Sequence, residues 1–253
     1  PVLVGRAVNF SNLSRNATAY EWDFGDGVTS TLENPTHIYG TVGAYTAVLT
    51  ASNYCATAVV TKAVQVENYA LALVAEANAL SGDPGQVVTY SLRLTNTGTL
   101  SDTFLLSLGS TSWATTLSTS AVQLGAGEGA VVEVYVTVPA GAAGGAQASV
   151  QVTARSGGDP RTPAASGSVV LTTRANSVYG VALGAGVVEQ AGDAGAVVTY
   201  TLWVTNTGNV VDTITITRTN PGWPTAFSWG QMNIAAGGRR EVKVYITIPF
   251  TAT

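Results

Sequence analysis

The stretch VVTYSLRLTNTG, Val87 to Gly98, returns as VVTYTLWVTNTG at Val197 to Gly208. Since 197 minus 87 is 110, the chain carries a tandem repeat with a period of 110 residues. In both copies every second residue from Val88 and Val198 onward is apolar, and the residues between them are mostly polar. This alternation has the period of an extended chain with one buried face, so it predicts a β-strand in each copy.

A second alternating segment follows in each copy, from Val132 to Val138 and from Val242 to Ile248. Turn-forming stretches such as Asp83-Pro84-Gly85 separate the alternating segments, and no helical periodicity of useful length occurs. Many short strands joined by Gly- and Pro-rich turns are typical of β-sandwiches. We therefore expect an all-β chain of three tandem immunoglobulin-like (Ig-like) β-sandwiches, at residues 1–67, 68–176 and 177–253.

The second copy of the repeat stops at Thr253, before any counterpart of the apolar segments 148–154 and 168–172 of the first copy. The sequence therefore predicts a last sandwich without its final strands. Trp113 and Trp223 occupy matching positions, and we expect both to fill the cores of their sandwiches. 

Two asparagines, Asn96 and Asn206, stand two residues before Gly98 and Gly208 at the ends of the repeated strand. Asparagine side chains accept hydrogen bonds from the backbone two residues on, so this pattern predicts an Asx turn in each copy.

The joints between the expected domains are short and contain no flexible Gly/Ser tether. Strands of about ten residues, at roughly 3.3 Å per residue, give sandwiches about 35 Å long. Three of them end to end would form a semi-rigid rod of about 100 Å, and that shape suggests reach or spacing.

Composition excludes several classes of function. Charged residues make up 10% of the 253 residues and the formal net charge is -4, so a basic surface for nucleic acid or an anionic membrane is absent. One cysteine, Cys55, and one histidine, His37, permit neither an internal disulfide nor a His/Cys metal cluster. No apolar run approaches the ~20 residues of a membrane span, so we expect no membrane insertion of this segment. Abundant Thr, Ser and Gly with little Cys favour an extracellular or cell-surface protein of bacteria.

The first block contains YEWDFGDG at Tyr20 to Gly27, then Asn34-Pro35-Thr36-His37-Ile38-Tyr39 and Gly43-Ala44-Tyr45. These motifs resemble the PKD domain, an Ig-like module, and the resemblance spans nearly all of residues 1–66. In this reading Trp22 and Phe24 share one face of a strand, and Asp26-Gly27 forms a hairpin turn. The resemblance also implies a strand ahead of Val2 to Val8, for which Pro1 leaves no room.

Two carboxylates in the first block, Asp23 and Asp26, could alternatively converge on a calcium ion, although a full site needs six or more oxygen ligands. For His37 we expect a packed, hydrogen-bonded side chain, because no nucleophile motif accompanies it. For Cys55, in the apolar stretch YCATAVV, we expect a small buried hydrophobe. Three Asn-x-Ser/Thr sequons, at Asn9, Asn12 and Asn16, are candidate glycosylation acceptors or chance matches.

The repeats are similar to bacterial Ig-like modules, of the type associated with NPCBM in alpha-galactosidases and of the CARDB adhesion type. The residues that carry this similarity are Tyr-x-Leu-x-Leu-Thr-Asn-Thr-Gly, then Asp-Thr, Trp and a valine strand ending in Thr-Val-Pro. The resemblance implies spacers, substrate-presenting modules or cell-surface stalks. No catalytic motif occurs in the sequence, so we expect no enzyme.

Outward positions that differ between the copies are candidates for binding or assembly. Trp203 replaces Arg93, and its indole is expected to point away from the core, near Tyr245. Tyr135 is the matching tyrosine of the first copy. Such a surface could hold a glycan, a protein ligand or a neighbouring subunit, whereas a covering loop or domain would give it no binding role.

Two classes of function fit these observations. The first is a structural or adhesive element, a rod of Ig-like domains in a bacterial stalk, surface layer or filament. Its partners would be copies of itself, joined by β-strand complementation at the incomplete ends, or adjoining domains of a longer chain. The second is an accessory substrate- or carbohydrate-binding region of a secreted hydrolase.

Overall fold

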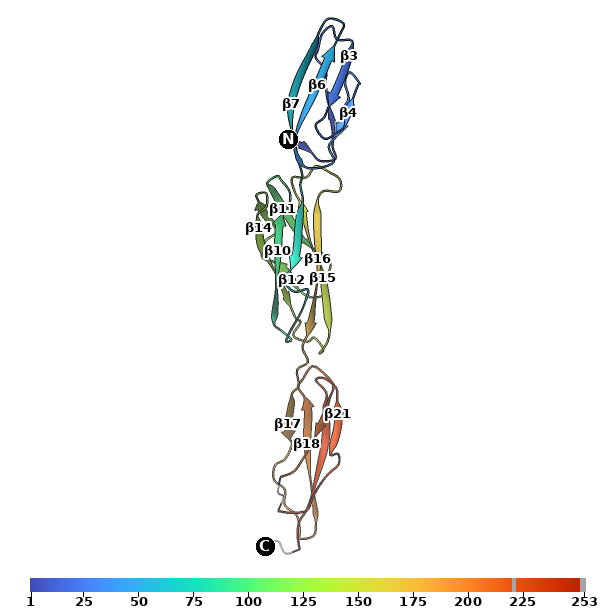
Figure 1. Cartoon of the computed structure of the whole chain (residues 1–253). Coiled ribbons are helices and arrows are strands. Elements are labelled where there is room, and N and C mark those ends of the chain that lie inside the picture. The colour runs from blue at the N-terminus through green and yellow to red at the C-terminus, as the bar shows by residue number, and fades with distance from the viewer. Residues whose placement is uncertain (220–221, 251–253) are drawn as a thin grey trace.

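The computed structural model describes residues 1–219 and 222–250 of the chain, and every regular element in them is a β-strand. We refer to residues 1–67 as the first unit, residues 68–176 as the second and residues 177–250 as the third. Figure 1 shows the three units following one another along a line, with the N-terminus beside the joint between the first and second units and the C-terminus at the far end of the third unit. The expected all-β class of tandem Ig-like sandwiches is confirmed.

The first unit pairs a five-stranded sheet with a two-stranded one. The large sheet has the order β1 (Val2–Leu3), β7 (Thr57–Glu67), β6 (Gly43–Ser52), β3 (Ala19–Asp23) and β4 (Thr29–Ser30). The small sheet consists of β2 (Ala7–Asn9) and β5 (Thr36–Ile38). Trp22, Phe24 and Tyr39 are buried between the sheets, so the WDFGDG strand turns its two aromatic residues inward as predicted.

The second unit is a sandwich of four and five strands. One sheet has the order β12 (Thr115–Leu117), β14 (Gly129–Thr137), β10 (Val87–Asn96) and β8 (Leu71–Ala75). The other has the order β13 (Ala121–Leu124), β11 (Asp102–Leu108), β15 (Gln147–Ser156), β16 (Ser166–Ala175) and β9 (Ala79–Gly82). The alternating residues of β10 and β14 face the core, where Tyr90, Leu92 and Val134 are almost fully buried.

The third unit repeats the first of these sheets in full and the second in part. Its sheets are β17 (Val181–Ala185), β18 (Val197–Asn206), β22 (Arg239–Thr247) and β20 (Thr225–Phe227), and the pair β19 (Asp212–Thr215) with β21 (Gln231–Ile234). The described residues of this unit include no counterpart of β15 or β16. Residues 189–192, which match β9, are not a strand, because β9 is hydrogen-bonded only to β16.

Two expectations about burial were wrong. Trp113 is buried as predicted, but Trp223 is 44% exposed. The core around Trp113 includes Val150 and Leu171 of β15 and β16, and these strands have no counterpart among the described residues of the third unit. Cys55 is exposed, because it lies in the turn between β6 and β7, where its backbone N–H donates to the side-chain oxygen of Asn53 at 2.8 Å.

Candidate functional site

The WDFGDG hairpin of the first unit binds its own backbone and one histidine. Asp23 accepts from the N–H of Gly25 at 2.9 Å, and Asp26 accepts from that of Val28 at 3.2 Å. Nε2 of His37 lies 2.7 Å from the other carboxylate oxygen of Asp26, and the imidazole is stacked on Phe24 with centroids 4.2 Å apart. His37 is therefore the packed, hydrogen-bonded residue expected.

The electrostatics of this hairpin support a structural role. Burial raises the pKa of Asp26, but the hydrogen bonds from His37 and Val28 outweigh it, and the pKa lies below its ordinary value. Among the described residues, no three His, Cys, Asp or Glu side chains come together as metal ligands. The carboxylates of Asp23 and Asp26 thus bind the hairpin backbone and His37.

The three sequon asparagines differ in access. Asn9 and Asn16 are exposed, and Asn16 sits in a turn with φ of 63°. The side-chain nitrogen of Asn12, which a glycan would have to modify, is buried in the folded unit. The structure therefore argues against Asn12 as an acceptor and leaves Asn9 and Asn16 as candidates.

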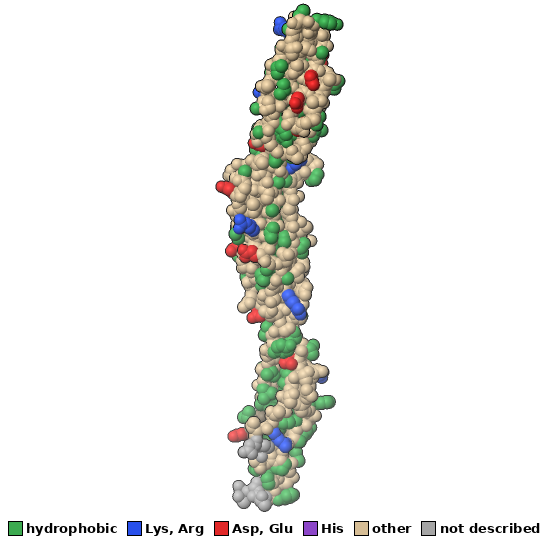
Figure 2. Space-filling model, in the orientation of Figure 1, with side chains coloured by type: hydrophobic (Ala, Val, Ile, Leu, Met, Phe, Trp, Pro, Cys, Tyr) green, Lys and Arg blue, Asp and Glu red, His purple; other side chains and the backbone are tan. Residues whose placement is uncertain are grey.

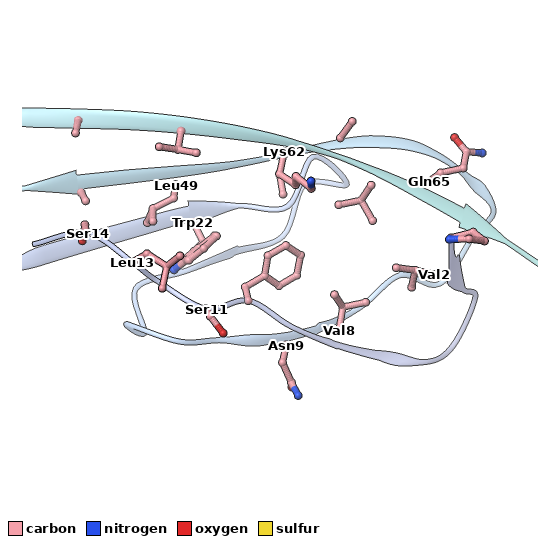
Figure 3. Close-up of a pocket in the computed structure, with 18 of the residues that line it drawn as sticks. Val2, Val8, Asn9, Ser11, Leu13, Ser14, Trp22, Leu49, Lys62 and Gln65 are labelled. Carbon is pink, nitrogen blue, oxygen red and sulfur yellow. The ribbon is translucent and has the colours of Figure 1, made fainter.

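The first unit also contains a groove of about 960 Å³ between β7 and the segment that follows β2. Figure 3 shows Val8, Trp22 and Leu49 projecting into the same space. The indole Nε1 of Trp22 is buried there, and the described residues offer it no hydrogen-bond partner. Lys62 lies on the rim, and nothing in the structure indicates what covers this groove.

The joint between the second and third units, residues 176–180, is bound on both sides by Asn209. The Asn209 side chain accepts from Val178 N–H at 2.7 Å and donates to the carbonyl of Asn176 at 2.9 Å. It also donates to the carbonyl of Ala142 at 3.1 Å, and the Asn209 carbonyl accepts from the N–H of Gly144 at 3.0 Å. Since Ala142 and Gly144 belong to the second unit, these last two bonds cross the boundary between units.

The joint between the first and second units has the same backbone arrangement but fewer hydrogen bonds. Thr99, 110 residues before Asn209, exchanges hydrogen bonds with Asn68 at 2.9 Å and 3.1 Å. The Thr99 side chain has no amide NH2 group, whereas the NH2 group of Asn209 donates a hydrogen bond across the second joint. The hydrogen bonds of the described residues include none between residues 1–67 and the rest of the chain.

Trp203 lies on the outer face of its sheet, as predicted, but it is half-buried. The guanidinium of Arg239 covers the indole at 4.2 Å from the ring centroid, a cation–π contact. Tyr245 is paired with Thr199, and Trp203 is paired with Glu241, four residues away along the same strand. The structure therefore does not bring Trp203 and Tyr245 side by side.

Tyr135 is half-buried, and its hydroxyl donates to the carboxylate of Glu133. This hydrogen bond, together with desolvation, raises the pKa of Tyr135. Its counterpart Tyr245 is more exposed. The binding role predicted for these residues stays a prediction.

Sequence reasoning missed a polar network within the loop between β15 and β16. The carboxylate of Asp159 accepts hydrogen bonds from Nε and Nη2 of Arg161, at 2.8 and 2.7 Å, and one from the N–H of Ala165 at 2.8 Å. Hydrogen bonds from Arg161 lower the pKa of Asp159 to about 2. Arg161 also donates to the carbonyl of Tyr69 at 2.8 Å, which ties the loop to the start of the unit.

Charged side chains are few and scattered over the face shown in Figure 2, as the composition predicts. No helix among the described residues has the length and apolar character needed to cross a membrane.

The fold is that of tandem Ig-like sandwich modules. Residues 4–67 match the PKD domain family and residues 71–172 match the VWA7 Ig-like domain family. The chain therefore contains a PKD domain followed by an Ig-like domain, and both kinds are typically non-catalytic. The finer resemblance of the repeats to NPCBM-associated and CARDB-like modules is not confirmed.

Three of the proteins similar to this chain are a collagenase and two surface-protein structures. A stretch of 32 residues is 62% identical to Collagenase ColA of Bacillus cereus, and it covers 13% of this chain and 3% of that protein. The D00-D0 domain of Intimin is 12% identical with a TM-score of 0.38, covering 67% of this chain and 94% of that one. Domains 4 and 5 of the S-layer protein SbsC are 15% identical with a TM-score of 0.29, covering 66% and 79%. Likenesses this distant imply no function for this chain.

Proposed function

We propose that this chain is a non-catalytic extracellular structural module, a semi-rigid row of Ig-like domains that holds other parts of a bacterial surface protein at a distance. The PKD and Ig-like families support a non-catalytic role. Abundant Thr, Ser and Gly with a single cysteine support an extracellular setting. A role in a stalk, surface layer or filament belongs to the same proposal.

The observation that carries the proposal is the second joint. A spacer transmits distance only if its domains keep their relative orientation, and most interdomain contacts leave domains free to move. Here Asn209 binds the linker and the preceding unit at once, through its side-chain amide and its carbonyl. Gly144 allows the close approach: a Cβ there would lie 2.2 Å from Cγ1 of Val210.

Distances between paired spin labels across the second joint test this proposal. The exposed residues Thr116 and Thr215 accept Cys substitutions, one in each unit, with Cys55 replaced by Ser to remove the native thiol. We expect a narrow distance distribution in this protein. The variant Asn209→Thr carries the residue of the first joint, and we expect it to broaden the distribution.

The matched control is a label pair across the first joint, on native Cys55 and Thr116→Cys. Asn209→Thr should leave that distribution unchanged, because Asn209 does not touch the first joint. A distribution across the second joint that is broad in the parent protein, or unaffected by Asn209→Thr, would contradict a locked spacer.

A second candidate function is an accessory region of a secreted hydrolase, favoured by the 62% identity over 32 residues to a collagenase. The test is co-sedimentation of the whole chain with insoluble collagen fibrils, with serum albumin as the control protein. Retention of the chain on collagen would support the accessory role, and its absence from the pellet would contradict collagen binding.

A further inference from the structure

A groove of about 430 Å³ opens at the edge of the third unit, where β22 begins. Its lining combines one aromatic ring, one thioether, two amides, a guanidinium and a carboxylate, from Trp229, Gln231, Met232, Asn233, Arg240 and Glu241. This size lies within the range of small-ligand pockets. The indole of Trp229 is 62% exposed, an unusual position for so large an apolar ring.

Hydrogen bonds on both sides hold the backbone that carries Trp229. Ser228 N–H donates to the carbonyl of Lys243 at 2.9 Å, and Lys243 N–H donates to the Ser228 hydroxyl at 3.0 Å. The carbonyl of Gly230 accepts from the N–H of Ile216 at 3.0 Å. Because β22 belongs to one sheet and Ile216 follows a strand of the other, Trp229 is fixed between the two sheets. Ligand binding would therefore cost little backbone entropy.

The second unit has the same frame with different side chains. Ser118 and Glu133 exchange the same two hydrogen bonds, at 2.9 and 3.0 Å, and Leu106 donates to the carbonyl of Ser120 at 2.8 Å. The residue between these clamps is Thr119. The other matching positions, 110 residues before the groove residues of the third unit, are Ala121, Val122, Gln123, Ala130 and Val131.

The third unit thus replaces small or aliphatic residues by functional groups at four of six positions on one frame. Thr, Ala, Ala and Val become Trp229, Gln231, Arg240 and Glu241. The strand behind the groove, β21, matches β13, which is an edge strand in the complete second unit as well. The groove is therefore open independently of the strands that lack a counterpart in the third unit.

The orientation of the polar groups is partly set. The hydroxyl of Thr213 donates to the side-chain oxygen of Asn233 at 2.6 Å. The NH2 group of the Asn233 amide makes no bond to Thr213. The carboxylate of Glu241 lies 3.5 Å from Nζ of Lys243 on the outer face. The Glu241 carboxylate therefore belongs to the outer rim and is already paired with Lys243. Apart from Arg240, the other polar groups of the lining are uncharged amides, which suits a ligand without strong charge.

We propose that this groove binds a carbohydrate chain of neutral sugars. The apolar C–H face of a sugar ring would stack on the Trp229 indole. Its hydroxyl groups would donate to the amide oxygen of Gln231 and accept from Arg240 and from the amide NH2 groups, which are the donor and acceptor types that a polyol needs. The site does not depend on the proposed spacer role, since it lies within one unit.

Isothermal titration of the whole chain with neutral oligosaccharides tests the proposal. The probes are hexasaccharides of glucose, xylose, mannose and N-acetylglucosamine at millimolar concentration. We expect at least one probe to bind, and Trp229→Thr to weaken its affinity roughly tenfold or more, as for a central aromatic contact. Thr is the residue of the second unit on the same frame, so this variant should keep the fold.

The matched control is Tyr179→Ala, which removes another exposed aromatic ring of the third unit that lies outside the groove. It should bind the same probe as the parent chain does. Failure of the parent chain to bind any probe would overturn the proposal. Equal affinity of Trp229→Thr and the parent chain for the bound probe would also overturn it. So would an immobilised chain that retains peptides from a library but none of the sugars.

Discussion

The side-chain nitrogen of Asn209 donates a hydrogen bond to the carbonyl oxygen of Ala142 at 3.1 Å, across the boundary between the second and third units. At the joint between the first and second units the matching residue is Thr99, whose hydroxyl accepts a hydrogen bond only from Asn68 of that joint. This substitution accounts for the side-chain bond across the second joint, and a backbone bond from Gly144 N–H to the Asn209 carbonyl is the second bond across that boundary.

Gly144→Ala should disturb the second joint. The added Cβ would stand 2.2 Å from Cγ1 of Val210, so one of the two units must shift. We expect a displaced or broadened distance distribution between labels in the second and third units. Val210→Ala in the same chain removes the closest atom and should restore part of the parent distribution. No displacement in the single variant would contradict the close packing.

Asn96→Ala should destabilise the second unit by about 3 kcal/mol, because it leaves buried backbone groups without partners. The Asn96 amide donates to the carbonyls of Leu100 and Leu124 at 2.8 and 3.1 Å, and its oxygen accepts from Gly98 N–H at 2.9 Å. Hydrogen exchange of peptides from β10 measures the change in that unit. The exposed Asn78→Ala is the control, with an expected change within about 0.5 kcal/mol.

Trp113→Ala and Trp223→Ala should differ although they change matching positions. Trp113 is 8% exposed and Trp223 is 44% exposed, so truncation leaves a cavity only at Trp113. We expect a loss of about 3–5 kcal/mol for Trp113→Ala and less than half of that for Trp223→Ala. Chemical denaturation followed by hydrogen exchange in each unit measures both, and equal losses would contradict the difference in packing.

Asp159→Asn should lower the stability of the second unit in a pH-dependent way. The folded pKa, about 2, lies below the ordinary value of 3.8, so the carboxylate stabilises the fold fully above about pH 4. That contribution, about 2 kcal/mol, is lost as the pH falls from 4 towards 2. The difference in free energy of unfolding between parent and variant should therefore shrink over this range.

Glu76→Gln is the control for that experiment, because Glu76 is an exposed carboxylate of the same unit. The free energy of unfolding of Glu76→Gln should stay close to that of the parent at every pH. A parent-to-Asp159→Asn difference that does not change between pH 4 and pH 2 would contradict the role assigned to the Arg161 hydrogen bonds.

Much of the fold could be predicted from local patterns in the sequence. Alternation placed the strands of the repeat and assigned their buried faces, as Tyr90 and Leu92 illustrate. The Asx turn predicted for Asn96 is confirmed by its bond to Gly98. The PKD motifs located the hairpin with Trp22 and Phe24 inward. These features depend on residues close in sequence, so the sequence reveals them.

The candidate sites could be predicted from the sequence less well. The sequence singled out Trp203 as a changed outward residue, but not the Arg239 that covers it. Trp229 went unnoticed, although comparison with Thr119 would have found it. The apolar neighbours of Cys55 predict a buried thiol, whereas a turn places it in solvent.

The sequence by itself determined the class of fold, the repeat and the inward face of each strand, because these follow from side-chain alternation and turn chemistry along one segment. Only the tertiary structure decided which units are bonded together and where polar and aromatic groups meet. Asn209 with Ala142, and Trp203 with Arg239, come from distant segments of the chain. The packing of whole sheets and loops brings such residues together, and no local pattern records it.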